Sequence, residues 1–275
     1  MKRFIILSLL AAVCTLALQA QTIHWITFVD TSDWDLGAVN KKGRQVLNSE
    51  FIDVVNQALF MRGYRSKKYD FTDSNTTPEN CKKTIEDFTC SPEDIVVFYY
   101  IGHGVRPALG EKYDRANPWP QLCLAQINEK KFIPLHWIHE ELKGKGARLV
   151  VTVGMCCNTR YTKAKHKNEP KFRSSFGKTI KENYAKRIQS WFLDYKGDVE
   201  VTSASPTQRS ITYQFQKWGA IDLFTGAIAS TMQQNSYKGS AITWDTFLKD
   251  VKRWCNSLSD QEQTPYYRTN LTLVK

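Results

Sequence analysis

The sequence predicts an α/β fold in which one central, mostly parallel sheet carries helices on both faces. Short hydrophobic runs alternate with longer segments of helical spacing along the chain. Two runs, residues 95–101 and 149–153, are almost continuously apolar, which is typical of central strands covered on both sides. The 275 residues provide for one large buried core, and no repeat or interdomain linker is recognisable.

The individual elements follow in order from local signals. Continuous or alternating apolar runs predict strands, and apolar residues three and four apart predict helices. Thr77 before Pro78 is a typical helix start, and Gly63 and Gly144 are typical helix ends. The elements expected are strand 23–29, helix 45–60, strand 64–71, helix 78–88, strand 95–101, strand 122–127, helix 134–142, strand 149–153, helix 180–192, strand 199–203, helix 223–232, helix 244–258 and strand 271–274.

The first twenty residues predict a secretory signal peptide. A basic start precedes a short apolar stretch over 4–18, and Ala20 offers a small residue for cleavage. The stretch is too short to span a bilayer comfortably, and no later segment approaches that length. Val13 ahead of Cys14 disfavours a lipid anchor on that thiol. We therefore expect a secreted or periplasmic protein without a membrane span, in which residues 21–275 form one domain.

The chain is basic even without this leader, because loss of Lys2 and Arg3 lowers the formal net charge only from +11 to +9. Such a charge favours anionic partners. The basic residues are dispersed, however, apart from one denser run over 163–186, which a solvated loop explains. No zinc finger, helix-turn-helix or stacking platform is recognisable, so we expect no nucleic-acid partner.

Six cysteines follow the leader, too widely spread for a disulfide scaffold: Cys81, Cys90, Cys123, Cys156, Cys157 and Cys255. Cys81 and Cys90 bracket a short helix and are candidates for pairing in an oxidising compartment. His136 and His139 lie three apart on a predicted helix, where packing suits them better than metal binding. We expect no metal and no cofactor, and the sequence leaves calcium dependence undecided.

Two short motifs carry the chemistry, and each follows a central strand. The strand over 95–101 runs into Gly102-His103-Gly104, and the strand over 149–153 runs into Gly154-Met155-Cys156-Cys157. Reactive groups of an open α/β sheet gather at the carboxyl ends of its strands, so we expect imidazole and thiol to meet there. A thiol needs a neighbouring base to become the nucleophilic thiolate. The amides of Gly104 and of the nucleophile are candidate donors to an oxyanion.

These motifs resemble those of a known superfamily. The histidine and the second cysteine are 54 positions apart, near the spacing of about fifty associated with caspases. Residues 97–104 resemble the strand and histidine motif of caspases and metacaspases, and 155–159 resemble their acidic-x-Cys nucleophile motif. Residues 201–206, 223–227 and 263–265 resemble later segments of bacterial caspase-like proteins. The resemblance implies a caspase-like three-layer sandwich and a Cys–His dyad.

Matched residue by residue, the resemblance places Cys157 at the nucleophile and His103 at its base. A shift of one position would make Cys156 the nucleophile instead, and this alternative stays open. The family normally uses a dyad, so no third residue is demanded. The amides of Gly104 and Cys157 are then the expected oxyanion hole.

The substrate preference stays open, because Met155 stands where the family usually has Asp or Glu. In metacaspases that acidic residue helps to form the pocket for a basic side chain. Candidate substrate-binding residues are Asp30, Asp33 and Asp35, which follow the first strand, and Ser203.

The resulting hypothesis is a secreted caspase-like cysteine endopeptidase, a hydrolase that acts on protein or peptide substrates. The alternative is a catalytically inert caspase-fold protein that binds peptides in the same cleft. A basic nucleic-acid binder is a third reading, which predicts salt-sensitive retention on DNA. Residues 158–178 are a candidate processing loop, because caspases carry theirs at this place, although a surface loop that is never cut explains them too.

Overall fold

The computed structural model describes residues 21–107, 116–124, 131–160 and 180–274. A six-stranded sheet at its centre has the strand order β11-β8-β7-β3-β1-β2. Neighbouring strands are parallel, except that β11 runs antiparallel to β8 at one edge. The strands are β1 (Thr22–Val29), β2 (Arg65–Thr72), β3 (Ile95–Ile101), β7 (Leu149–Met155), β8 (Tyr195–Thr202) and β11 (Tyr266–Leu273). The predicted α/β class with a mostly parallel sheet is confirmed.

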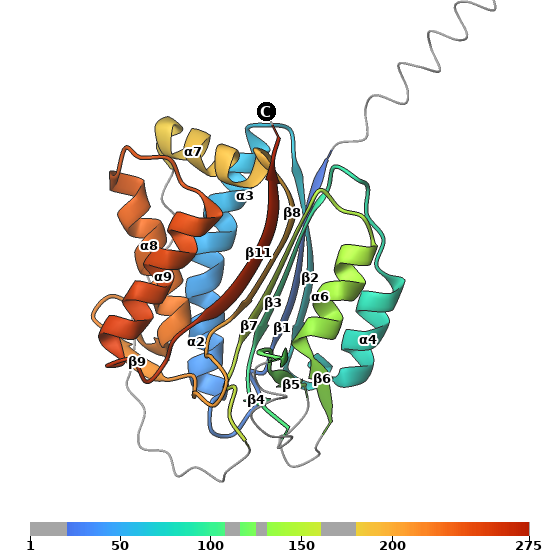
Figure 1. The fold of residues 1–275 in the computed structure, drawn as a ribbon, viewed down its shortest axis with the longest axis vertical. Helices are drawn as coiled ribbons and strands as arrows, with labels where there is room; N and C mark the ends of the chain where they lie inside the picture. The colour runs from blue at the N-terminus through green and yellow to red at the C-terminus, as the bar shows by residue number, and fades with distance from the viewer. Residues whose placement is uncertain (1–20, 108–115, 125–130, 161–179, 275) are drawn as a thin grey trace, which may run out of the picture.

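Helices cover both faces of the sheet and complete a three-layer sandwich (Figure 1). One face carries α2 (Gly37–Leu47), α3 (Asp53–Phe60), α7 (Glu182–Leu193), α8 (Leu223–Tyr237) and α9 (Trp244–Leu258). The other face carries α4 (Pro78–Asp87) and α6 (Leu135–Gly144). A π-helical turn, Asn48–Ile52, joins α2 to α3, so the chain stays helical across both.

Alternation along the central strands explains why the sheet is buried on both sides. On β3, Val97 and Tyr99 belong to the core beneath α2, α3 and α7–α9, whereas Phe98 and Tyr100 belong to the core beneath α4 and α6. Every residue of β3 is buried. Strands covered on both faces need this continuous apolar character, which is the pattern that the sequence displays.

Two small sheets lie apart from the central one. The first consists of β4 (Gly104–Val105), β5 (Gln121–Cys123) and β6 (Phe132–Pro134), at the carboxyl ends of the central strands (Figure 1). The second pairs β9 (Thr212–Phe215) with β10 (Gly219–Asp222). Strands of two to four residues are too short to show a period, so the sequence pattern does not predict β4, β6, β9 and β10.

Several predicted boundaries were wrong. The helical stretch begins at Gly37 rather than residue 45, because its first two turns are mostly polar and hide the apolar period. β11 begins at Tyr266 rather than 271, since an exposed edge strand lacks the apolar run that marks a central one. The leader 1–20, the end of the predicted strand 122–127 and most of the candidate processing loop lie outside the described residues.

Cys81 and Cys90, the candidates for pairing, are both free thiols in the structure. Cys81 is buried in the core under α4, while the Cys90 thiol lies 3.6 Å from the carbonyl oxygen of Lys145. In the part of the chain that the structure describes, no helix is both long and apolar enough to cross a membrane.

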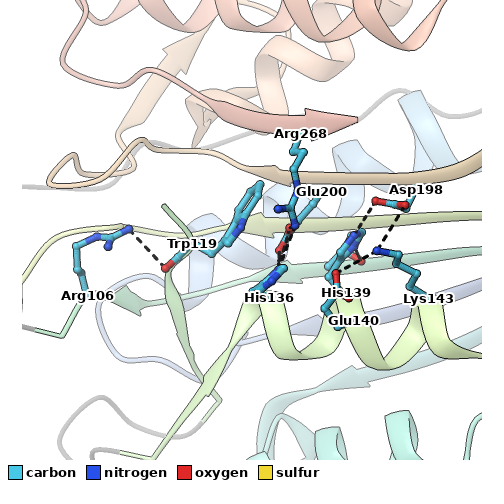
Figure 2. A network of polar contacts seen from close by, with 10 residues as sticks. Arg106, Trp119, His136, His139, Glu140, Lys143, Asp198, Glu200 and Arg268 are labelled. Carbon is cyan, nitrogen blue, oxygen red and sulfur yellow. Dashed lines mark hydrogen bonds and ion pairs between the residues drawn. The ribbon is translucent and has the colours of Figure 1, made fainter. Parts of the chain in front are cut away.

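A polar network joins α6 to β8 and β11 (Figure 2). His139 is fully buried and contacts Thr152 and Asp198, each at 3.1 Å. One turn earlier, His136 lies 3.0 Å from a carboxylate oxygen of Glu200, and Arg268 donates to the other oxygen at 2.9 Å. Both histidines thus have polar partners in the fold, as expected for packing residues.

The variant Glu200→Gln should gain stability relative to the wild type as pH rises. Burial raises the pKa of Glu200 from the usual 4.5 to about 8, against the opposing charge of Arg268. Folding therefore favours the neutral carboxyl group of Glu200. Its contribution to the stability of the folded wild type is fully present below about pH 4.5 and is lost as pH rises through about 8. Urea unfolding at pH 5, 7 and 9 should show Glu200→Gln gaining on the wild type between pH 5 and 9.

The control for this prediction is Glu140→Gln, which changes an exposed carboxylate on α6. It should follow the wild type at every pH. A difference between Glu200→Gln and wild type that is the same at all three pH values would contradict the proposed cause.

Candidate active site

The carboxyl ends of β1, β3 and β7 lie side by side because these three strands are in register. Val29 is opposite Ile101, and Ile101 is opposite Met155. Beyond these positions the chain reaches His103 after β3 and Cys157 after β7. The topology therefore brings together the two motifs that the sequence singles out.

Gly104 is the point at which the two motifs touch. A Cβ atom at this position would lie 2.5 Å from Sγ of Cys156, and closer still to the carbonyl oxygen of Cys157. The histidine segment is held from the other side by Cys123, whose N–H donates to the carbonyl oxygen of His103 at 3.0 Å. Only glycine permits this close approach of the two segments.

Substitution of Gly104 by alanine should destabilise the protein and disturb the site. The added methyl group has to push back the backbone of Cys157, which we expect to cost about 3 kcal/mol, or roughly 6–12 °C in Tm. Thermal denaturation followed by circular dichroism measures the change. Gly144→Ala is the control, since a Cβ there meets nothing within 4 Å and should leave Tm unchanged or higher. Equal stability of the two variants would contradict the close contact.

Asp33 holds the imidazole of His103. Its Oδ2 lies 3.2 Å from Nε2 of His103, and its side chain is only 3% exposed. Burial alone would raise the pKa of Asp33, but His103 and the backbone N–H groups of Leu36 and Asp35 outweigh it and bring the pKa to about 2. Because Nε2 is engaged, Nδ1 is the nitrogen left for chemistry.

The same contact changes the imidazole. Burial opposes protonation of His103, but the carboxylates of Asp33, Asp30 and Asp35 together raise its pKa above the usual 6.5. Its side chain is 18% exposed, so a substrate can reach it. His103 is thus a partly accessible base whose orientation is fixed and whose neighbours are negatively charged carboxylates.

The thiol of Cys157 is half-buried and contacts Ser210. The backbone N–H of Ser210 donates to Sγ at 3.3 Å, and its carbonyl oxygen lies 3.9 Å from the same atom. Burial raises the pKa of Cys157, while the Ser210 N–H and the charge of Arg209 partly offset that rise. The resting thiol is therefore held in its protonated form.

Cys156 lies in a different environment, although it is the neighbouring residue. It is buried in the core beneath α4 and α6, and burial raises the pKa of its thiol well above the usual value. Its backbone is fixed by Ser203, whose Oγ accepts from the Cys156 N–H and donates to its carbonyl oxygen, both at 3.0 Å. Ser203 is itself fully buried under this segment.

A second polar cluster supports Ser210 from behind. The Ser210 hydroxyl donates to Oδ2 of Asp222, and Gln263 donates to it at 3.5 Å. Oδ1 of Asp222 caps α8 by accepting from the N–H groups of Phe224 and Thr225. Burial raises the pKa of Asp222 to about 6 despite these donors. The carboxylate of Asp222 thus lies behind Ser210, the residue that contacts the Cys157 thiol. The position two residues before Cys157, usually acidic in the family, is Met155.

Arg106 and Asn158 tie the two motifs together from a third side. Nε of Arg106 donates to Oδ1 of Asn158 at 3.0 Å, and both residues are buried. The Asn158 amide group donates to the carbonyl oxygens of Pro118 and Ala204. Arg106 also donates to the carbonyl oxygen of Trp119, which leads into the network on α6 (Figure 2).

The sequence pattern missed this supporting set. Its members are Arg106, Asn158, Ser210, Asp222 and Gln263. Asp222 directly before a predicted helix carries a recognisable N-cap signal. The carboxylate of Asp33 was singled out for substrate, and the structure places it against His103, whereas Asp30 binds Ser32 and the N–H of Asp33. No group of three or more metal-ligating side chains occurs among the described residues.

Comparison with known proteins identifies the class. The family model for the caspase domain matches residues 52–272, and the chain therefore belongs to the caspase domain family. A crystal structure of a Geobacter sulfurreducens protein is similar at 14% identity and a TM-score of 0.46, over 90% of this chain and 92% of that one. No curated protein matches the sequence.

Proposed function

We propose that this caspase-domain protein is a cysteine endopeptidase with Cys157 as nucleophile and His103 as base. The observation that carries the proposal is the ion pair between Asp33 and His103 at the carboxyl end of β3, next to the segment of Cys157. An imidazole held at Nε2 can present Nδ1 to a thiol. The half-buried Cys157, rather than the fully buried Cys156, supports the assignment of the nucleophile.

The reaction would follow the chemistry of a thiol and a base. Nδ1 of His103 takes the proton from Sγ of Cys157, and the thiolate attacks the carbonyl carbon of the scissile peptide bond. The amides of Gly104 and Cys157 are the proposed donors to the developing oxyanion. The imidazolium then protonates the leaving amine, and water, activated by the same imidazole, hydrolyses the thioester.

The contact between Cys157 and Ser210 implies an activation step within this cycle. Sγ rests against the backbone of Ser210, while His103 is paired with Asp33. Substrate binding has to turn the thiol away from Ser210 and towards the imidazole. The raised pKa of Cys157 fits a thiol that becomes reactive only on this turn.

Turnover of a peptide library by the mature chain, residues 21–275, tests the proposal. We expect cleavage of a subset of peptides, detected by mass spectrometry and abolished by prior treatment with iodoacetamide. Intact protein and protein cut within residues 158–178 should both be assayed, because we propose that segment as a site of activating cleavage. Full activity of a chain that stays uncut would rule out the need for processing.

A second function has specific support, namely an inert protein that binds peptides at the same site. Met155 in place of an acidic residue and the raised pKa of the Cys157 thiol both favour it. Peptides that bind both chain forms without being cleaved would establish this function and exclude the first.

We further propose export, with residues 1–20 removed as a signal peptide. The support is the short apolar stretch behind a basic start. N-terminal sequencing of the protein from the culture medium or periplasm should begin near Gln21, and a mature chain that retains Met1 would contradict it.

A further inference from the structure

The loop between β1 and α2 is a rigid structure built on its own carboxylates. Oδ1 of Asp30 accepts from the N–H of Asp33 at 3.1 Å. Oδ1 of Asp33 accepts from the N–H groups of Asp35 and Leu36 at 2.9 and 2.7 Å. The loop is therefore fixed by the same residue that fixes His103.

This rigid loop presents one large side chain to solvent. Trp34 is 85% exposed, although tryptophan is among the side chains with the most apolar surface to bury. The carboxylates of Asp30 and Asp33, which both precede it in the loop, are buried. Tryptophan on an ordered loop can provide a large binding contact at a small cost in conformational entropy.

The position of Trp34 decides what it can bind. It follows Asp33, whose carboxylate is 3.2 Å from the imidazole of His103. The loop that carries Trp34 therefore adjoins the proposed base of the site. Phe60, another exposed aromatic residue, lies before β2, whose start is opposite the start of β1, and thus at the other end of the sheet.

We propose that Trp34 binds a large apolar side chain of the substrate, close to the scissile bond. This inference rests on the proposed peptidase function of the site. The commitment to an apolar side chain follows from the 85% exposure of the indole, whereas the carboxylates of Asp30 and Asp33 are occupied by contacts within the protein. Binding of a basic side chain through Asp35 is the competing outcome.

Peptide selectivity of the variant Trp34→Ala tests the inference. The substrate cleaved best from the library is compared with analogues in which each residue in turn is alanine. For the wild type, one apolar residue near the scissile bond should raise kcat/KM by about 10- to 100-fold, mainly by lowering KM. In Trp34→Ala this preference should disappear, and Trp34→Phe should restore most of it. Phe60→Ala is the matched control and should retain the full preference.

The outcomes separate this inference from the proposed function. Cleavage with the same selectivity in wild type and Trp34→Ala overturns the inference and leaves the function standing. Loss of a preference for arginine or lysine, instead of an apolar residue, also overturns it. If the wild type cleaves nothing, binding of the library is measured by fluorescence polarisation. Trp34-dependent binding of apolar peptides then supports the inference while the peptidase function fails, and binding that ignores Trp34 overturns it.

Discussion

Replacement of Cys157 by alanine is expected to abolish peptide cleavage, with kcat/KM falling by on the order of 10⁴-fold or more. The expectation follows from the position of Sγ, which is half-buried beside the segment of His103 and contacts backbone atoms of Ser210. Without this thiol no acyl-enzyme can form. Hydrolysis of the best library peptide and labelling by a thiol-directed peptide probe provide the two readouts.

Cys156→Ala is the matched control for this prediction. Cys156 is fully buried and contributes to packing against Gly104, so its truncation should cost about 1–2 kcal/mol of stability. Activity at a temperature where both variants are folded should stay within about tenfold of the wild type. Probe labelling that survives in Cys157→Ala and is lost only in Cys156→Ala would reverse the assignment of the nucleophile.

The second large effect is expected for Asp33→Asn, which should lower kcat/KM by on the order of 10²–10⁴-fold. An amide keeps the shape of the side chain but removes the charge that holds Nε2 of His103. The imidazole of His103 can then adopt a tautomer or an orientation in which Nδ1 no longer faces the thiol. Iodoacetamide labelling of Cys157 in the denatured protein should be unchanged, which shows that the thiol is present and intact.

The pH profile distinguishes this role of Asp33 from a merely structural one. Asp33 raises the pKa of His103, so its loss should move the acid limb of the pH–rate profile to lower pH. The pKa of Asp33 is lowered to about 2, so its stabilisation is present above about pH 4 and lost as pH falls towards 2. Asp73→Asn, a neighbouring carboxylate that accepts from Thr31, is the control and should leave the profile unchanged. An unshifted acid limb in Asp33→Asn would contradict the assignment.

The fold could be predicted from the sequence because its central strands are buried on both faces. Continuous apolar runs mark such strands directly, and the rule that functional groups gather at their carboxyl ends then places His103 and Cys157. The start of the edge strand β11 was predicted poorly, since this largely exposed strand carries no such run, whereas the other edge strand, β2, was predicted to within one residue. Strands as short as β4 form only because another segment lies beside them.

The supporting residues of the site could not be predicted for a related reason. Arg106 and Asn158 are 52 positions apart and each is ordinary in its local sequence. Their pairing depends on how two loops meet after the sheet has formed. The same holds for Asp33, whose role as the partner of His103 depends on the path of the loop after β1.

The dispersion of these residues along the chain has a consequence for the newly made protein. Asp33, His103, Cys157, Asp222 and Gln263 come from the whole length of the sequence, and chains fold from the N-terminus as they are synthesised. An incomplete chain that ends before β7 has the imidazole but no thiol, and one that ends before α8 lacks the carboxylate behind Ser210. On the proposed peptidase function, a ribosome-bound chain therefore gains its complete catalytic site only when synthesis is nearly finished.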